Sequence, residues 1–321
     1  MTKPTVVLTR RLPEGVERVA AERFEVRTNA DDHRLSVAET QAALQTADGI
    51  ICTLGDPLRA DTLGAGPWCT KILANFGAGT DHIDLAAAKA AGLVVTNTPG
   101  ALTEATADLA MALILMATRR LGEGEREVRR GDWTGWRPTH LLGNSVQGKT
   151  LGIVGFGRIG QATARRAKLG FGMNVVYASR STPAASHQRP EARSLSLDEL
   201  LATSDVVSLH TPATSETIGM IDARRIALMK RGSYLINTAR GSVVDEAALI
   251  DALKSGQLAA AGLDVYSQEP LVPSALLALS NVVTLPHLGS ATIETRTAMG
   301  MRAVENLTAI FAGKPPLDPV T

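Results

Sequence analysis

The chain has 321 residues, a length that predicts two domains, each large enough to bury a core of its own. Lysine and arginine total 33 against 32 aspartates and glutamates, so a net charge of +1 excludes the single-signed field that draws in nucleic acid or an anionic membrane, and we expect a small-molecule partner. The N-terminal stretch has no secretory h-region, and no apolar run reaches the roughly 18 residues of a membrane helix, so we expect a cytoplasmic protein. Two cysteines are too few for a disulfide framework and lack metal-ligand spacing, so we expect no metal site.

The first hundred residues alternate short apolar strands with helices. We expect strands at 5–9, 25–28, 49–53, 71–75 and 93–96, and helices at 16–24, 37–45 and 85–91. This alternation predicts a small parallel sheet. Residues 53–57 and 75–80 follow strands, so they form loops at the carboxyl edge, where open α/β sheets bind ligands. Their glycines either expose backbone N–H groups to an anion or form plain turns.

After residue 100 a long helix replaces the alternation of short strands and helices. Leu102 to Thr118 is apolar almost all round, which is typical of a helix buried between two domains, and Asp108 within it is expected to have a structural role. Residues 121–142 continue as a charged helix and an irregular loop that holds Trp133 and Trp136. This density of tryptophan predicts docking against another surface; the alternative is that both rings pack within their own subunit.

The stretch from Thr150 to Gly160 reads as a buried strand that ends in a G-x-G-x-x-G pattern. Gly155 suits a tight turn, Gly157 lets the backbone approach a pyrophosphate, and Gly160 lets the next helix lie close to the strand. A helix and a second strand over 161–178 complete a strand–helix–strand unit of about 30 residues. This context favours dinucleotide binding at the helix N-terminus over a plain glycine-rich turn.

A missing acid predicts which dinucleotide binds. NAD-binding units carry an Asp or Glu about 20 residues beyond the glycines, where it binds the ribose 2′-OH and would repel a 2′-phosphate. No acid occurs between Gly160 and Glu191, and the second strand instead ends in Ser179-Arg180-Ser181-Thr182. A guanidinium and hydroxyl donors there suit a 2′-phosphate, and Arg158 in the glycine loop adds positive field. We therefore expect NADP(H) to be preferred over NAD(H), unless Arg180 is only a solvated loop cation.

The second domain continues the alternation of strands and helices. Its strands are expected at 151–155, 174–178, 205–210, 233–238, 258–266 and 281–285, six in all. Ser196 and Glu199 form a capping box, Asp245 caps a helix over 246–254, and the last helix begins near Ser290. These elements make the two halves of a Rossmann fold. The last helix is expected to cross back to the first domain, so that the domains are joined twice with a cleft between them.

Three predicted strand ends carry residues with useful chemistry: Arg240, Glu269 and His287. Singly, they read as a surface cation, a turn residue before proline and a histidine at a helix terminus. Together they define a candidate active site, since an arginine can bind a carboxylate as a fork and a histidine can exchange a proton near neutral pH. A carboxylate hydrogen-bonded to a histidine favours the charged imidazole and fixes its orientation.

Six ordered motifs resemble those of the D-isomer-specific 2-hydroxyacid dehydrogenases, and the resemblance covers nearly the whole chain. The motifs are Asn75-Phe-Gly-Ala-Gly-Thr-Asp-His-Ile-Asp84, Gly155-Phe-Gly-Arg-Ile-Gly160, Leu209-His-Thr-Pro212, Asn237-Thr-Ala-Arg-Gly241, Gly262-Leu-Asp-Val-Tyr266 with Glu269-Pro270, and Pro286-His-Leu-Gly-Ser-Ala-Thr292. The Trp133-Thr-Gly-Trp136-Arg-Pro138 loop is similar to that of the glyoxylate and hydroxypyruvate reductase branch. The resemblance implies an α/β fold of two parallel-sheet domains joined by two crossing helices, with a flavodoxin-like substrate domain over 1–100 plus 289–321 and an NADP-binding Rossmann domain over 101–288.

The resemblance also implies a role for each candidate residue. His287 would protonate the substrate carbonyl oxygen while NADPH delivers hydride, Glu269 would keep that imidazole charged, and Arg240 would bind the substrate carboxylate. The implied substrate-binding residues are Leu54, Gly55, Phe76, Ala78, Gly79, Trp136, Arg240 and His287. The implied cofactor-binding residues are Thr106, Gly155, Phe156, Gly157, Arg158, Ile159, Gly160, Ser179, Arg180, Ser181, Thr182, His210, Thr211, Pro212, Thr217, Thr238, Ala239, Arg240, Asp264, His287 and Gly289.

The resemblance further implies a homodimer, in which Trp136 reaches the partner's substrate pocket, and a hinge closure that excludes water. His210 matches a position lining the cofactor, whereas His82 is expected to open a helix and to be structural. The reaction would reduce a small 2-keto acid to the D-2-hydroxy acid. Glyoxylate, hydroxypyruvate and 2-ketogluconate all suit the same carboxylate clamp, so the sequence leaves the preferred acid open.

Other functions share this architecture. A non-catalytic NAD(P)H-sensing corepressor would carry a partner-binding tail, and here Thr321 follows the last helix by only a few residues. A phosphoglycerate dehydrogenase-like enzyme would often append a regulatory domain, and relatives that oxidise formate carry glutamine where this chain has Glu269. We therefore expect an NADP-dependent 2-hydroxyacid dehydrogenase, with the sensing protein and the phosphoglycerate dehydrogenase-like enzyme as alternatives.

Overall fold

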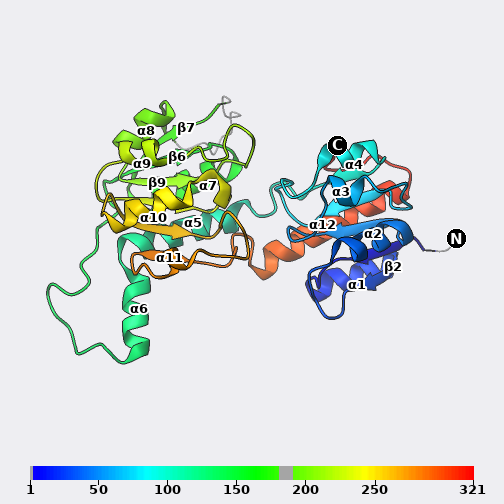
Figure 1. Cartoon of the computed structure of the whole chain (residues 1–321), viewed down its shortest axis with the longest axis horizontal. Coiled ribbons are helices and arrows are strands. Elements are labelled where there is room, and N and C mark those ends of the chain that lie inside the picture. Colours follow the sequence, from blue (N-terminus) through cyan, green and yellow to red (C-terminus); the bar gives the residue numbers. More distant parts are fainter. Residues whose placement is uncertain (1–2, 181–190) are drawn as a thin grey trace. The chain divides into compact units, whose positions relative to one another are not determined.

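Two parallel sheets organise the chain in the computed structural model, which describes residues 3–180 and 191–321 (Figure 1). The residues group into two units, the first formed by Met1–Leu102 with Ser290–Thr321 and the second by Thr103–Gly289. The predicted α/β class with two parallel sheets is confirmed. In the described part of the chain, no helix has the length and apolar character needed to span a membrane.

The first unit holds a five-stranded sheet with the order β2-β1-β3-β4-β5, every neighbouring pair being parallel. The strands are β1 (Thr5–Leu8), β2 (Glu25–Thr28), β3 (Gly49–Cys52), β4 (Ile72–Asn75) and β5 (Val94–Thr96). This is the flavodoxin-like order, in which the carboxyl ends of the central strands form the ligand-binding edge. β3 and β4 are buried along their whole length, as expected for strands covered on both faces.

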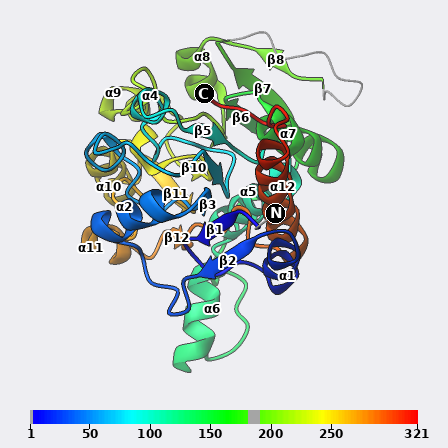
Figure 2. The same ribbon diagram turned by 90° about the vertical axis from the view of Figure 1, so that its right-hand side faces the viewer.

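Helices cover both faces of this sheet. They are α1 (Glu14–Arg23), α2 (Val37–Thr46), α3 (Ala60–Leu63), α4 (Leu85–Ala90) and α12 (Ile293–Phe311). α1 and α12 lie side by side on one face, while α2, α3 and α4 pack on the other (Figures 1 and 2). Gly300 of α12 permits the close approach of α1, because a Cβ at Gly300 would lie 2.7 Å from the side chain of Val16.

The second unit holds a seven-stranded parallel sheet with the order β12-β11-β10-β9-β6-β7-β8. Its strands are β6 (Thr150–Val154), β7 (Asn174–Ala178), β8 (Arg193–Ser194), β9 (Val206–Leu209), β10 (Ser233–Asn237), β11 (Leu258–Leu263) and β12 (Val282–Thr284). The chain places β7 and β8 on one side of β6 and every later strand on the other. The order therefore reverses between β6 and β9, and a Rossmann fold binds its dinucleotide at that switch point.

Helices cover both faces of this second sheet. The helices of the second unit are α5 (Thr103–Thr118), α6 (Leu121–Arg130), α7 (Arg158–Phe171), α8 (Leu197–Thr203), α9 (Ala223–Leu228), the 3₁₀ turn η1 (Gly241–Val243), α10 (Glu246–Lys254) and α11 (Ser274–Leu277). α5 and α7 cover one face, while α8, α9, α10 and α11 cover the other. Asp108 on α5 forms an ion pair with Arg166 on α7 at 2.6 Å, and its structural role stays a prediction.

The structure corrects several sequence-based expectations. The count of six strands in the second unit is wrong, because β8 adds a seventh of two exposed residues, too short to show any hydrophobic period. α3 was not expected, for it spans only one turn. His82 does not open a helix: Asp84 caps α4, and His82 lies buried in the turn before that cap. The predicted caps at Ser196 and Asp245 are confirmed.

Candidate active site

The glycine-rich turn between β6 and α7 has the geometry that its sequence predicts. Gly155 has a φ of +91°, and a Cβ there would lie 2.5 Å from the carbonyl oxygen of His210, so only glycine fits. A Cβ at Gly160 would lie 2.2 Å from the oxygen of Gly155, which shows how closely the helix approaches the turn. Gly157, by contrast, meets nothing within 4 Å, so the space beside its Cα is open.

This turn fits a dinucleotide pyrophosphate. α7 begins at Arg158, and its first intrahelical hydrogen bond runs from the Gln161 N–H to the Gly157 oxygen, so the three preceding N–H groups point out of the helix N-terminus. Such a terminus binds anions through its free donors and its dipole. Phe156 contributes only its backbone, because its ring is 1% exposed and stacks on Tyr177 with the centroids 4.0 Å apart.

His210 lies at the switch point, since its N–H donates to the oxygen of Val154 at 2.7 Å. Its Nε2 lies 2.9 Å from the hydroxyl of Ser208. Burial lowers the pKa of His210 to about 4, so the ring is neutral near pH 7. His210 can therefore line a cofactor site by shape and hydrogen bonding, but it supplies no positive charge to a phosphate.

The loop after β7 carries the residues predicted to recognise a 2′-phosphate. Ser179 and Arg180 are exposed at the strand end, whereas Ser181 and Thr182 lie outside the described residues. Arg180 forms an ion pair with Glu216, whose loop follows β9. Sequence reasoning missed Glu216 because it is 36 positions away from Arg180, and only the sheet order brings the two loops together.

The glutamate and histidine that the sequence predicts to be catalytic lie in contact in the second unit. His287 Nδ1 lies 2.8 Å from Glu269 Oε2, and the other carboxylate oxygen of Glu269 accepts the N–H of Tyr266 at 3.1 Å. The two side chains are 32% and 29% exposed, so a substrate can reach them, unlike a histidine buried in a core. Burial alone would raise the pKa of Glu269, but the hydrogen bond and charge of His287, together with the charge of Arg240, bring that pKa below its ordinary value.

A buried aspartate holds the loop that carries His287. The backbone of His287 adopts a φ of +54°, a left-handed conformation that is unusual for a residue with a side chain. Asp264, fully buried at the end of β11, accepts the N–H groups of Leu288 at 2.6 Å and Gly289 at 2.8 Å. The hydroxyl of Thr106 adds a hydrogen bond to the oxygen of Gly289 at 3.0 Å. Asp264 and Thr106, both predicted to bind cofactor, thus fix the backbone beside His287.

Arg240 follows β10 on a loop that an asparagine closes. Asn237 accepts the Ala239 N–H at 3.0 Å and donates to the Arg240 oxygen at 2.9 Å. Gly241 brings this loop against the Glu269 loop, because a Cβ there would lie 1.9 Å from the carbonyl carbon of Tyr266. The structure therefore brings Arg240, Glu269 and His287 together within one unit.

The other residues predicted to bind the cofactor surround these strand ends. Thr211 and Pro212 follow His210 directly, and Thr217 closes their loop by donating to the Pro212 oxygen at 2.6 Å. Thr238 is 9% exposed, and its buried hydroxyl has no hydrogen-bond partner among the described residues.

The loops predicted to bind substrate lie in the first unit. Leu54 and Gly55 form the turn after β3, and Asp56 holds that turn by accepting the Thr53 N–H at 2.7 Å and the hydroxyl of Thr9 at 2.5 Å. Burial raises the pKa of this Asp56 carboxyl against the opposing effect of those hydrogen bonds. Phe76, Ala78 and Gly79 form the partly exposed turn after β4.

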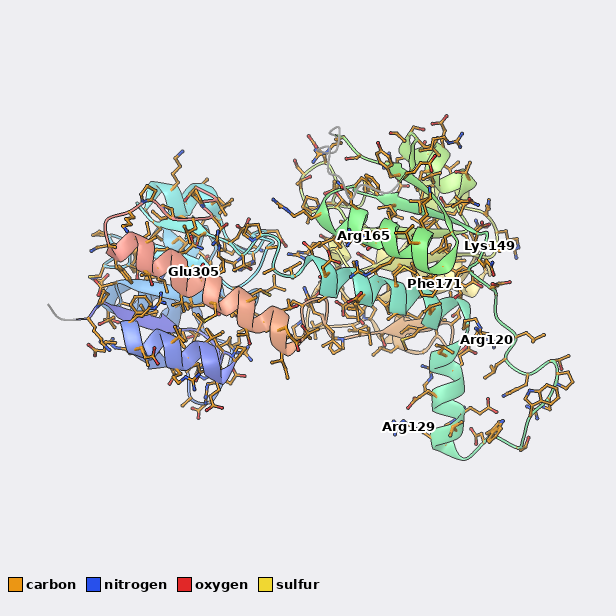
Figure 3. All side chains as sticks on the ribbon, turned by 180° about the vertical axis from the view of Figure 1, so that it is seen from behind. Arg120, Arg129, Lys149, Arg165, Phe171 and Glu305 are labelled. Carbon is orange, nitrogen blue, oxygen red and sulfur yellow. The ribbon has the colours of Figure 1, made fainter. Side chains whose placement is uncertain are left out.

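α6 and the loop beyond it form a separate exposed feature. No residue of α6 is buried, and Figure 3 shows Arg120 at its base and Arg129 further along it. In the loop, Trp133 is 54% exposed and Trp136 is 82% exposed. The alternative in which both rings pack within their own subunit therefore finds no support in the second unit, which contains this loop.

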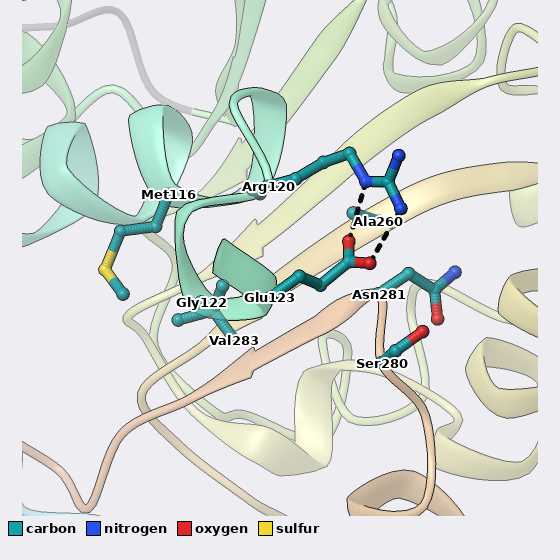
Figure 4. Close-up of a pocket in the computed structure, with 9 residues that line it drawn as sticks. Met116, Arg120, Gly122, Glu123, Ala260, Ser280, Asn281 and Val283 are labelled. Atoms are coloured by element: carbon teal, nitrogen blue, oxygen red, sulfur yellow. Dashed lines mark hydrogen bonds and ion pairs between the residues drawn. The ribbon is translucent and has the colours of Figure 1, made fainter. Parts of the chain in front are cut away.

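The pocket in Figure 4 is a different place. It lies among the end of α5, the start of α6 and the beginning of β12, away from the strand ends just described. Its lining residues are Met116, Ala117, Arg120, Gly122, Glu123, Ala260, Ser280, Asn281 and Val283. Two of these lining residues, Arg120 and Glu123, form an ion pair with each other at 2.8 Å, so the charge of each is compensated by the other.

These features, a dinucleotide-type turn at a Rossmann switch point beside an arginine, a glutamate and a histidine, agree with known proteins. Residues 111–289 match the D-isomer specific 2-hydroxyacid dehydrogenase NAD binding domain. The chain belongs to this family, as its sequence motifs predicted, and residues 111–289 form its nicotinamide dinucleotide-binding domain.

Within the family the chain is similar to glyoxylate reductases. It is 44% identical over 318 residues to the glyoxylate reductase of Thermococcus onnurineus, covering 98% of this chain and 95% of that protein. Among solved structures, a Thermus thermophilus protein superposes with a TM-score of 0.90 at 46% identity, covering 99% of this chain and all of the other. The NADPH-dependent glyoxylate/hydroxypyruvate reductase of Sinorhizobium meliloti, solved with NADP and malonate, gives a TM-score of 0.87 at 36% identity and covers 100% and 97% of the two chains.

Proposed function

We propose that this enzyme reduces a small 2-keto acid, namely glyoxylate, hydroxypyruvate or 2-ketogluconate, to the D-2-hydroxy acid, with NADPH preferred over NADH. The observation that carries the proposal is the contact of 2.8 Å between the accessible side chains of His287 and Glu269, where the charge of Arg240 also acts on the Glu269 carboxylate. The names of the relatives from Thermococcus onnurineus and Sinorhizobium meliloti support the substrate class.

His287 is the proposed acid of the reaction. With Nδ1 held by Glu269, Nε2 is the ring nitrogen left to face a carbonyl oxygen and to give it a proton. Glu269 stays ionised because its pKa is lowered, and this negative charge stabilises the imidazolium from which the proton comes. A bound reduced nicotinamide supplies the hydride that makes this protonation a reduction.

Arg240 is the proposed ligand of the substrate carboxylate. Its guanidinium can offer two parallel N–H donors to a carboxylate, and it would also draw electron density from an adjacent carbonyl group. The N–H groups of Ala78 and Gly79, with the Leu54–Gly55 turn and Phe76, are the proposed remaining part of the substrate site. In this assignment the first unit is the substrate-binding domain, and the second unit binds the cofactor and carries Arg240 and His287.

The preference for NADPH is proposed from Arg180 and from the missing acid after β7. Arg180 is an exposed cation at the strand end where the adenosine ribose of a dinucleotide lies in Rossmann folds. The relative from Sinorhizobium meliloti is NADPH-dependent and has been solved with NADP. We propose that the other cofactor-binding residues implied by the sequence bind the remaining parts of the dinucleotide.

We also propose that the enzyme is a homodimer and that the loop holding Trp133 and Trp136 takes part in the interface. Two indole rings exposed beyond half of their surface on one short loop place apolar area in water, and neighbouring exposed apolar side chains often mark an interface. Trp136 is proposed to contact the substrate site of the partner.

The experiment is a turnover panel of the three keto acids with NADPH and NADH, run on the wild type and on His287→Ala. We expect activity in the wild type and a fall in kcat of about 10²–10⁴-fold in the variant, with NADPH affinity nearly unchanged, as loss of a general acid predicts. Full turnover by His287→Ala would refute the acid assignment. A wild type that reduces none of the acids would refute the proposed function.

A further inference from the structure

The turn from Phe76 to Thr80 has all its middle carbonyl groups tied to neighbouring residues. Asn75 Nδ2 donates to the oxygen of Gly77 at 3.1 Å and to that of Gly79 at 2.9 Å. Asn97 Nδ2 donates to the oxygen of Ala78 at 2.7 Å. Three consecutive carbonyl oxygens are thus held by two side-chain amides, one at the end of β4 and one directly after β5, its neighbour in the sheet.

This arrangement fixes the direction of the N–H groups as well. In a trans peptide the C=O of one residue and the N–H of the next point in opposite directions. Because the carbonyls of Gly77, Ala78 and Gly79 face the asparagines, the N–H groups of Ala78, Gly79 and Thr80 face away from them. In the described part of the chain, these three N–H groups have no hydrogen-bond partner. Successive backbone N–H groups of a turn that are left without a partner can form an anion-binding concavity.

The burial of Asn75 argues against an ordinary turn. Asn75 is 1% exposed, and its Oδ1 is buried without a hydrogen-bond partner among the described residues, so the side chain is positioned for its donors at the expense of its acceptor. The turn itself is partly exposed, and water could satisfy its carbonyls. A buried amide with an unpaired oxygen is a costly way to satisfy them unless their orientation matters.

We infer that Asn75 and Asn97 are positioning residues for the substrate carboxylate: they hold the carbonyls of the turn inward so that the N–H groups of Ala78, Gly79 and Thr80 bind that carboxylate. This inference rests on the proposed function and deepens it, because it adds a third donor and two residues that do not touch substrate. An amide suits the task because its NH₂ group donates without a charge. An aspartate would set oxygen against oxygen and repel the anion.

The test uses Asn97, because this half-buried side chain can be changed with less risk to folding than the fully buried Asn75. Asn97→Ala should raise KM for glyoxylate by about 3- to 10-fold, the factor expected from one hydrogen bond, with kcat changed less than KM. Asn97→Asp should raise it further. The inhibition constant of oxamate, a carboxylate that is not reduced, should rise in parallel, while the dissociation constant of NADPH measured by fluorescence stays constant.

Asn281→Ala is the matched control. Asn281 also donates to two backbone carbonyls, those of Leu253 and Ala259 at 3.3 and 3.1 Å, but at the amino end of β12. Its loss should lower the melting temperature without changing KM or the oxamate constant. A folded Asn97→Ala enzyme with wild-type KM and oxamate inhibition would overturn the inference, as would equal changes in KM for Asn97→Ala and Asn281→Ala. A wild type inactive on every keto acid would instead reject the proposed function.

Discussion

Replacement of Arg180 by alanine tests the cofactor assignment most directly. In the structure Arg180 pairs with Glu216, and the two side chains are 66% and 65% exposed. An ion pair so open to water is worth only about 0.2–1 kcal/mol. Charge-assisted hydrogen bonds between a guanidinium and a phosphate are worth roughly 1.5–3 kcal/mol. A 2′-phosphate should therefore displace Glu216 from Arg180.

These energies set the expected size of the effect. Because every 1.4 kcal/mol corresponds to a factor of ten, Arg180→Ala should weaken NADPH by about ten- to a hundredfold and leave NADH little changed. Glu216→Gln removes the competing charge, so it should improve NADPH by about 1.4- to 5-fold, again with little effect on NADH. The opposite signs of the two variants distinguish phosphate recognition from a general loosening of the loop.

The assay is kcat/KM for each cofactor at a fixed keto acid concentration, with cofactor dissociation constants from fluorescence titration. Equal losses for NADPH and NADH in Arg180→Ala would show that the arginine does not recognise the 2′-phosphate. A wild type whose kcat/KM with NADH equals or exceeds that with NADPH would refute the reading of the whole loop.

Two further predictions concern the acid–base pair and the exposed loop. Glu269→Gln should lower the kinetic pKa that governs keto acid reduction, because the neutral amide no longer stabilises the imidazolium. In the wild type the pKa of Glu269 is lowered, so this stabilisation is present above the ordinary carboxyl pKa and is lost only as the pH falls through the lowered pKa of Glu269. An unchanged pH–rate profile would count against the pairing. Trp136→Ala should change the ratio of kcat/KM among the three keto acids more than it changes NADPH affinity. Light scattering of the wild type at micromolar concentration should give the mass of a dimer. A monomer mass would refute the proposed interface.

Sequence patterns predicted those parts of the molecule in which one short segment determines its own structure. The roles of Gly155 and Gly160 followed from spacing alone, since a tight turn and a close helix need glycine in any Rossmann unit. The strand β8 was not predicted, because its two exposed residues show no hydrophobic periodicity. Glu216 was missed because its effect depends on Arg180, a residue on another strand end, and no local pattern encodes that contact.

The asparagines show the same limit of sequence-based prediction, even inside the recognised motifs. Asn75 and Asn237 both stand in stretches that the sequence marked for chemistry, yet their function as backbone clamps becomes visible only when the atoms they bond are known. Asn97 stood in no such motif. Its amide reaches Ala78 because β5 lies beside β4, so its contribution is a consequence of sheet order.

The position of His287 depends on residues that never need to touch a substrate. Its left-handed backbone is held by Asp264, which binds the next two N–H groups, while Gly241 brings the Arg240 loop against the loop of Glu269. A misplacement of about 1 Å in a reacting group can cost a hundredfold in rate, so the hydrogen bonds that fix these loops matter as much as the groups they carry. Asp264 and the glycine at 241 are therefore expected to be needed for the geometry of the proposed acid–base pair, although neither supplies a reacting group.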